Sequence, residues 1–154
     1  MIPRRIVVAT DGSPAAGQAE AFAADEAALM ATSGPVEIVV LTAMHDVGHL
    51  AGPGGTIPPS REALEAEQVS EAGRVHILGL LEGRDLGANI QVLSKAVSAL
   101  TLSGAVTAEA HATGTCSLIV MGNRGHGGMS EALLGSVSLD VVHRAHCPVV
   151  IVRE

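Results

Sequence analysis

The chain has 154 residues, of which 47% are hydrophobic and 16% charged, and its formal net charge at pH 7 is −7. This length suits a single domain over residues 1–154, and because Phe22 is the only Phe, Tyr or Trp, the core must be aliphatic. So acidic a chain repels phosphate backbones, which disfavours nucleic acid as a partner, and no apolar run approaches the roughly 20 residues that span a bilayer.

The N-terminal residues, MIPRRIVV, lead straight into a strand-like run and show no signal-peptide pattern. The two cysteines, Cys116 and Cys147, do not make a disulfide framework. Both features fit a reducing cytoplasm, where we expect the protein. The charged fraction is below the roughly 25% of average domains, which indicates a surface partly covered by a partner subunit.

Short apolar runs alternate with segments of helical pattern along the whole chain. Ser13 can cap the first helix, with Pro14 at its first position, and the Gly and Pro residues between 45 and 59 predict a loop. The predicted strands are 5–10, 36–43, 89–97, 117–122 and 147–153. The predicted helices are 14–33, 60–83, 104–114 and 136–145. The second of these helices is expected to take its apolar face from Leu64, Val69, Val75, Leu78 and Leu81.

This alternation predicts an α/β fold with a parallel sheet, because strands that are apolar throughout must be covered on both faces by helices. In such sheets ligands bind beyond the carboxyl ends of the strands, where the strand order reverses. Two turn clusters leave strand ends, "TDGS" after the first strand and "GNRG" after the fourth. If those two strands are neighbours, the clusters form the two walls of a crevice.

The second cluster opens a glycine-rich segment with the spacing Gly122-x2-Gly125-x9-Gly135-Ser136. Glycines that expose main-chain N–H groups before a helix N-terminus make an anion site, and the hydroxyls of Ser136 and Ser138 could donate to phosphate oxygens. The alternative is that the glycines only turn the chain and Ser136 only caps the helix. The segment matches neither a P-loop nor the dinucleotide fingerprint, so P-loop kinases and nicotinamide dehydrogenases are poorly supported.

Three segments, "VVATDGS", "SLIVMGNRGHGG" and "LLGSVSLDVVHRAHCPVVIVR", resemble the universal stress protein family, whose ATP-binding members carry the same glycine and serine spacing. The resemblance covers essentially the whole chain and is weakest between residues 45 and 105. It implies a single-domain open sheet of five parallel strands in the order 3-2-1-4-5. Helices would cover both faces, as in Rossmann-like and adenine nucleotide alpha hydrolase-like folds. It also implies a homodimer through the C-terminal edge strand.

The resemblance further implies an ATP site between the first and fourth strands, with any Mg²⁺ arriving on the nucleotide. Asp11 would bind the adenosine end, since a carboxylate beside the triphosphate would repel it, although an Asx turn that starts the helix explains Asp11 equally. Ser117 stands where the family commonly has Asp. The adenosine end would also contact Ala9, Thr10, Ala43 and the main chain of Met121 and Gly122. The phosphates would be held by Arg124, Gly125, His126, Gly135, Ser136, Val137 and Ser138.

No catalytic nucleophile with an adjacent base is evident, so any ATP hydrolysis is expected to be slow. His143, His146 and Cys147 lack the further ligands and geometry of a metal site, and we expect none there. The favoured interpretation is therefore an ATP-binding sensor or regulator of a stress response. Two alternatives stay open: a stress protein of the same fold that works through protein contacts without nucleotide, and an adenylylating enzyme. The second lacks support because "ATDGSPAA" contains neither a Ser-Gly-Gly-x-Asp-Ser loop nor a His-x-Gly-His motif.

Overall fold

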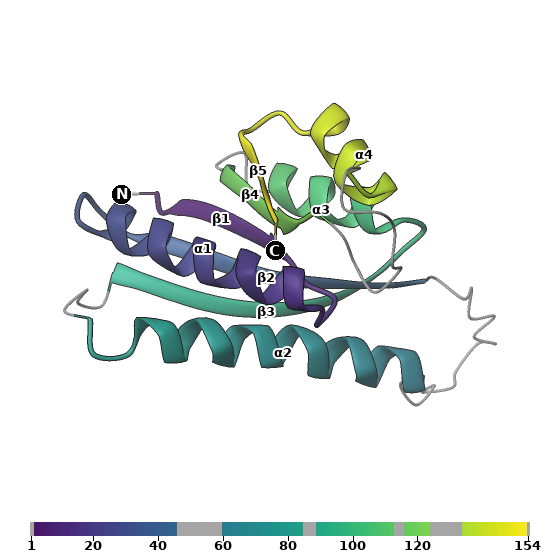
Figure 1. Ribbon diagram of the computed structural model, residues 1–154, viewed down its shortest axis with the longest axis horizontal. Coiled ribbons are helices and arrows are strands. Elements are labelled where there is room, and N and C mark those ends of the chain that lie inside the picture. Colours follow the sequence, from purple (N-terminus) through teal and green to yellow (C-terminus); the bar gives the residue numbers. More distant parts are fainter. Residues whose placement is uncertain (1, 46–59, 85–88, 113–115, 124–133, 154) are drawn as a thin grey trace.

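The computed structural model describes residues 2–45, 60–84, 89–112, 116–123 and 134–153, which form five strands and four helices in strict alternation (Figure 1). The strands are β1 (Arg4–Ala9), β2 (Val36–His45), β3 (Ile90–Ala99), β4 (Cys116–Gly122) and β5 (Val149–Val152). The helices are α1 (Pro14–Ala31), α2 (Arg61–Leu81), α3 (Leu102–His111) and α4 (Ser136–Arg144). The loop predicted over 45–59 falls outside these ranges from residue 46 onward.

The five strands make one parallel sheet in the order β3-β2-β1-β4-β5, which confirms the predicted fold class. Helices α1 and α2 pack on one face and α3 and α4 on the other. The chain leaves β1 toward β2 on one side and returns to β4 on the other. The order therefore reverses between β1 and β4, and their carboxyl ends meet at one edge of the sheet.

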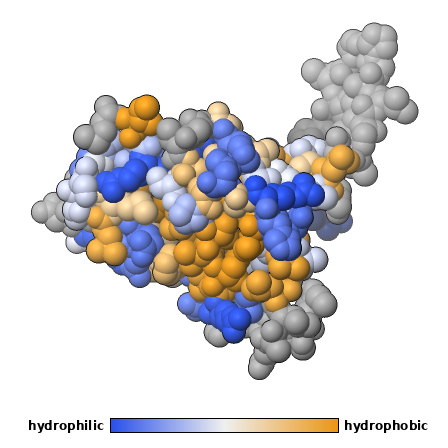
Figure 2. Space-filling model, turned by 90° about the horizontal axis from the view of Figure 1, so that it is seen from above, coloured by the Kyte–Doolittle hydropathy of each residue, from blue (hydrophilic) through white to orange (hydrophobic). Residues whose placement is uncertain are grey.

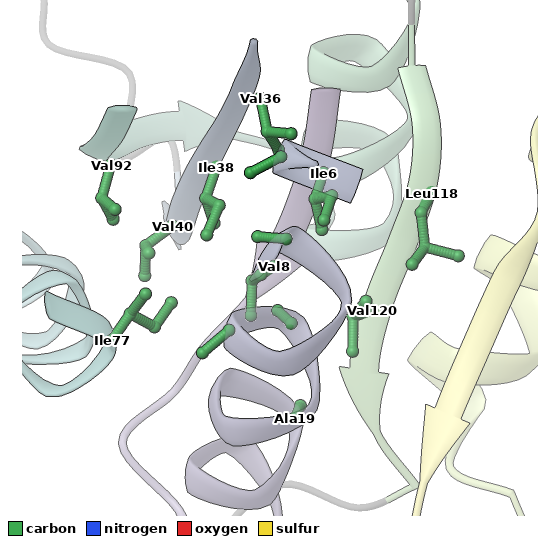
Figure 3. Packing of buried hydrophobic residues seen from close by; sticks show 14 residues of the cluster. Ile6, Val8, Ala19, Val36, Ile38, Val40, Ile77, Val92, Leu118 and Val120 are labelled. Carbon is green, nitrogen blue, oxygen red and sulfur yellow. The ribbon is translucent and has the colours of Figure 1, made fainter. Parts of the chain in front are cut away.

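Alternate residues of each strand feed two separate aliphatic clusters. Ile6 and Val8 of β1 lie under the alanine-rich face of α1, beside residues of β2 and β4 (Figure 3). Val7 and Ala9 point the other way, toward α3 and α4. Because α1 contributes mainly alanine to the first cluster, its backbone lies close to the sheet, and the core closes without aromatic side chains.

Helices α1 and α3 each begin directly after a residue whose side chain caps them. The Ser13 hydroxyl accepts from the N–H of Ala16, with Pro14 as the first residue of α1, which confirms the predicted cap. The helix predicted over 104–114 begins two residues earlier, because the Thr101 side chain caps it by accepting from the N–H of Gly104. In the described residues no helix is both long enough and apolar enough to cross a bilayer.

The apolar face predicted for α2 is wrong in part. Leu64, Val75 and Leu78 are 45%, 56% and 41% exposed. The helix buries a stripe of mostly small residues instead: Ala66, Ser70, Gly73 and Ile77.

Gly73 shows why the residues of this stripe are mostly small. A Cβ there would lie 2.8 Å from Glu20 Oε1 and 2.9 Å from Val40 Cγ1. Helix α2 thus packs too closely on α1 and β2 to admit a larger side chain at that position.

We expect Gly73→Ala to destabilise the fold by roughly 1–2 kcal/mol, because overpacking outweighs the gain in helix propensity. Gly79 of the same helix is the matched control, since nothing lies within 4 Å of a Cβ built there. Gly79→Ala should stabilise the fold by about 0.5–1 kcal/mol. Urea unfolding of both variants measures this difference, and two changes of the same sign would contradict the packing at Gly73.

Candidate functional site

The turn after β1 forms one wall of the predicted crevice. Thr10 is buried, its N–H donates to Leu41 O (2.9 Å), and its carbonyl accepts from the Thr42 hydroxyl (3.1 Å). Gly12 has a φ of +76°, a region that glycine enters without a steric cost. Asp11 is half-buried, and its Oδ1 accepts from the N–H of Ser13 at 2.9 Å. This is the Asx turn that sequence analysis offered as the alternative reason for Asp11.

Behind the same turn lies a buried carboxylate that sequence analysis missed. Glu20 of α1 accepts from the Thr10 hydroxyl at 2.7 Å, and its second oxygen lies 2.7 Å from Nδ1 of His76 on α2. The Glu20 side chain is only 6% exposed. The side chain of Thr10, a predicted site residue, is thus engaged on the α1/α2 side, where it fixes the end of β1.

Three of the predicted adenosine-end residues share the other face of the sheet. Ala9 and Met121 belong to the cluster under α3 and α4, and Ala43 packs against it. Ala9 and Met121 are buried and Ala43 is half-buried. The structure therefore brings the ends of β1, β2 and β4 together with small or apolar side chains on the α3/α4 side.

The end of β4 lies directly against the start of α1. A Cβ on Gly122 would lie 2.9 Å from the Cβ and 3.0 Å from the carbonyl carbon of Ala15. Only glycine permits this approach, so Gly122 has a packing role as well as its predicted place at the crevice. Three of the seven residues predicted to hold the phosphates, Arg124, Gly125 and His126, lie outside the described residues.

Asn123 joins the two ends of the glycine-rich segment. Its N–H donates to Val152 O (2.9 Å), and its carbonyl accepts from the N–H of Gly135 (3.0 Å). Its side-chain Oδ1 is buried and has no hydrogen-bond partner, the one such side-chain atom found in the described part of the chain. A buried acceptor without a donor is uncommon in folded proteins. Asn123 lies within the "GNRG" cluster, but the motif spacing, which uses only glycine and serine, does not indicate it.

The N-terminus of α4 differs from those of the other helices. Ser13, Ser60 and Thr101 cap α1, α2 and α3 with their side chains, whereas Gly135 at the N-cap of α4 offers none. The first main-chain bond within this turn runs from the N–H of Leu139 to Gly135 O. The N–H groups of residues 136–138 precede that bond and carry the positive end of the helix dipole.

The two serines of this turn have different surroundings. Ser136 is exposed, whereas Ser138 is 2% exposed. The Ser138 hydroxyl donates to Gly122 O (3.3 Å) and Asn123 O (3.4 Å), so it fastens α4 to the end of β4. What Ser138 can offer an anion here is its main-chain N–H, and Ser136 can offer both N–H and hydroxyl.

Helix α4 is held in place by Asp140. This carboxylate accepts from the Ser103 hydroxyl of α3 and from Arg144 Nε (3.0 Å). The hydrogen bond from Ser103 and the guanidinium of Arg144 lower the pKa of Asp140 below its ordinary value of 3.8, although some desolvation opposes them. In the part of the chain that the structure describes, no three His, Cys, Asp or Glu side chains could hold a metal ion.

Fold and site together define an open parallel α/β protein of the Rossmann-like class, with a turn after β1 facing an uncapped helix after β4. Residues 3–153 match the sequence profile of the Universal stress protein family, and the chain belongs to that family.

Named relatives agree with this assignment. A universal stress protein of Mycobacterium tuberculosis is 30% identical over 150 residues, which are 97% of this chain and 45% of the relative. One of Mycolicibacterium smegmatis is 28% identical over 149 residues, 96% of this chain and 47% of the relative. The chain thus spans less than half the length of these curated relatives. Among solved structures, the universal stress protein of Archaeoglobus fulgidus in complex with dAMP has a TM-score of 0.67 and 25% identity, with 99% of both chains covered.

Because the native pKa of Asp140 is lowered, its ionised form contributes stability above pH 4 or so that is lost as the pH falls through the native pKa. We therefore expect Asp140→Asn to lower the urea midpoint at pH 7, and the deficit to shrink at pH 3. Asp25→Asn is the control, since Asp25 forms an exposed ion pair with Arg84 and should shift the midpoint little. An Asp140→Asn deficit of equal size at both pH values would contradict the role given to the carboxylate.

Proposed function

We propose that the chain binds an adenine nucleotide, ATP, in the crevice between the carboxyl ends of β1 and β4. The observation that carries this proposal is the N-terminus of α4, which closes the Gly122-x2-Gly125-x9-Gly135-Ser136 spacing and which no side chain of the described residues caps. A helix end of this kind attracts phosphate through its N–H groups and its dipole. Main-chain amides can therefore supply the contacts in a chain whose formal net charge is −7.

The adenosine end of the nucleotide would lie over the α3/α4 side of the sheet. Ala9, Ala43 and Met121 offer small or apolar surface there. Asp11 leaves β1 at the same edge, and its carboxylate would repel a triphosphate but can accept from ribose hydroxyls or the adenine amino group. This orientation places the phosphates toward α4. The complex of the Archaeoglobus fulgidus relative with dAMP supports an adenine nucleotide as the ligand class.

In this proposal the chain acts as a sensor or regulator of a stress response in the cytoplasm, and any Mg²⁺ arrives with the nucleotide. Both cysteines are free thiols, as a reducing compartment favours. A role through protein contacts without nucleotide remains the alternative outcome of the binding test.

The test replaces Ser136, which is exposed at the first position of α4. Ser136→Glu places a carboxylate where the phosphates would lie, while an acid in the first turn of a helix leaves the fold intact. We expect a loss of ATP affinity of roughly tenfold or more, because two like charges would meet at short range. Ser136→Gln, of similar size but uncharged, should lose less. Isothermal titration calorimetry measures both.

Two results would contradict the nucleotide site. One is wild-type protein that binds no ATP at millimolar concentration. The other is Ser136→Glu that binds ATP as tightly as the wild type while its thermal unfolding shows an intact fold. The first result would favour the protein-contact alternative, and the second would move the phosphates away from α4.

We also propose a homodimer through β5, which forms one edge of the sheet. The carbonyls of Pro148 and Val152 accept from β4, so the alternation along a parallel strand directs the N–H and C=O groups of Val149 and Ile151 away from it. An apolar strand with outward main-chain groups invites pairing with its copy. Figure 2 shows apolar side chains gathered on the face seen from above, the side where β5 and α4 lie in Figure 1.

Ile151→Pro removes an outward N–H without touching the bonds to β4, and we expect it to weaken the dimer by about tenfold or more. Ile151→Ala is the matched control, because it shortens the side chain and keeps the N–H. Light scattering coupled to gel filtration over a dilution series gives the dissociation constant. A wild-type monomer at high concentration, or equal weakening by both variants, would argue against pairing of the edge strands.

A further inference from the structure

The two cysteines of the chain are 31 positions apart in sequence but meet in the fold. Cys147 Sγ lies 3.2 Å from Cys116 Sγ, and both residues are half-buried free thiols. Cys116 opens β4, and Cys147 lies just before the neighbouring strand β5. The bond from the N–H of Ile119 to Pro148 O (2.9 Å) anchors the two segments next to the cysteines. The sheet itself thus holds the sulfur atoms together.

We propose that Cys116 and Cys147 are a modification site at which a peroxide forms a reversible disulfide within the chain. A disulfide bond is about 2.05 Å long, so closure requires the sulfur atoms to approach by roughly 1 Å. The start of β5 can supply that movement, since Val149 is only half-buried and lies on the edge strand. Both thiols are only half-buried, so a small oxidant can reach them.

The oxidation has two steps. The thiolate of Cys147 attacks one oxygen of the peroxide, the O–O bond breaks, and Cys147 becomes a sulfenic acid while hydroxide or alkoxide leaves. The Cys116 sulfur then attacks the sulfenic sulfur, which releases water and forms the S–S bond. In sum, two thiols and one hydroperoxide give one disulfide, one water and one further water or alcohol. The two sulfur atoms lose two electrons, and the peroxide oxygens gain them.

The surroundings of the two thiols indicate which one attacks the peroxide and which one attacks the sulfenic acid. Burial, with a further contribution from Cys147, raises the pKa of Cys116 to about 12, which leaves little thiolate there at neutral pH. We therefore assign the first attack to Cys147, which lies on the segment leading into the edge strand β5. Cys147 follows His146, whose ring stacks on that of His111 with ring centroids 3.5 Å apart.

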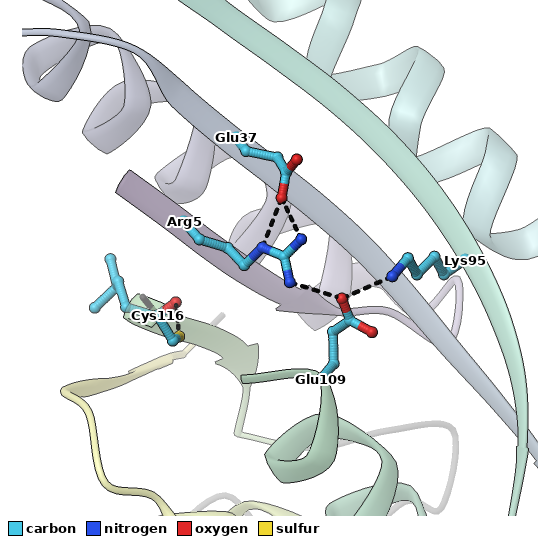
Figure 4. Close-up of polar contacts among 6 residues, drawn as sticks. Arg5, Glu37, Lys95, Glu109 and Cys116 are labelled. Carbon is cyan, nitrogen blue, oxygen red and sulfur yellow. Dashed lines mark hydrogen bonds and ion pairs between the residues drawn. The ribbon is translucent and has the colours of Figure 1, made fainter. Parts of the chain in front are cut away.

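Arg5 lies opposite Cys116 in the register of β1 and β4. Its guanidinium opposes the rise in the pKa of Cys116 but is shared by two carboxylates, Glu37 and Glu109, the latter also bound by Lys95 (Figure 4). Its charge is therefore largely neutralised, and burial prevails at Cys116.

The disulfide would close a loop that contains Gly122, Gly135 and the whole of α4. A crosslink of this length restricts the unfolded chain and stabilises the folded one. Oxidation would therefore raise the free energy of unfolding of the chain, whether or not a nucleotide binds. The inference is independent of the proposed function, because it rests only on the two thiols and the strands that carry them.

The experiment treats the purified full chain with increasing hydrogen peroxide, followed by quenching. We expect both thiols to disappear together, the intact mass to fall by two hydrogen atoms, and the chain to stay monomeric on a non-reducing denaturing gel. The oxidised protein should unfold at a temperature higher by roughly 5 °C or more, and dithiothreitol should reverse every change.

Single variants test the order of the steps. In Cys116→Ser, the remaining Cys147 should give a sulfenic acid that dimedone traps about tenfold faster than Cys116 is trapped in Cys147→Ser. Equal trapping rates, or faster trapping at Cys116, would overturn the assigned order.

Three results with the wild type would overturn the site itself. In the first, both thiols survive a peroxide concentration that oxidises glutathione. In the second, each cysteine is oxidised independently to sulfinic acid. In the third, disulfides form only between chains.

Discussion

The three main-chain N–H groups in the first turn of α4 are the feature on which this account of the protein depends. Among the described residues no side chain caps them, although the other three helices are each capped by a Ser or Thr. Two contacts bring this turn to the carboxyl ends of β1 and β4, the approach of Gly122 to Ala15 and the bond from the N–H of Gly135 to Asn123 O. A polar helix end left open at the switch point of an α/β sheet is suited to an anionic ligand.

Close packing of backbones elsewhere in the fold also helps to fix the turn after β1. The alanines of α1 and the stripe of mostly small residues on α2 let both helices lie near the sheet, so the chain builds its core without large aromatic residues. This packing also buries Glu20, whose carboxylate holds the Thr10 hydroxyl and thereby fixes the turn that carries Asp11. On the other face, Asp140 ties α4 to Ser103 of α3. The turn after β1 and helix α4 are thus each fastened by a carboxylate, on different faces of the sheet.

The order of strands and helices could be predicted from the sequence because each apolar run and each cap acts locally, as Ser13 and Pro14 show. The buried face of α2 could not be predicted, because Gly73 faces Glu20 and Val40, which are distant in sequence. The stronger apolar pattern along the helix belongs to the exposed Leu64, Val75 and Leu78. At the site, the motif indicated Gly135 and Ser136. It could not indicate that the Ser138 hydroxyl binds the end of β4, or that Asn123 Oδ1 is buried without a partner among the described residues, because both depend on tertiary contacts.

The most direct test is an NMR titration of the labelled chain with ATP that follows the amide resonances of Ser136, Val137 and Ser138. We expect these three resonances to shift together, and those of the turn after β1, at Thr10 and Asp11, to shift with the same dependence on ATP concentration. Saturation of the protein with ATP while the three α4 amides stay unmoved would contradict it.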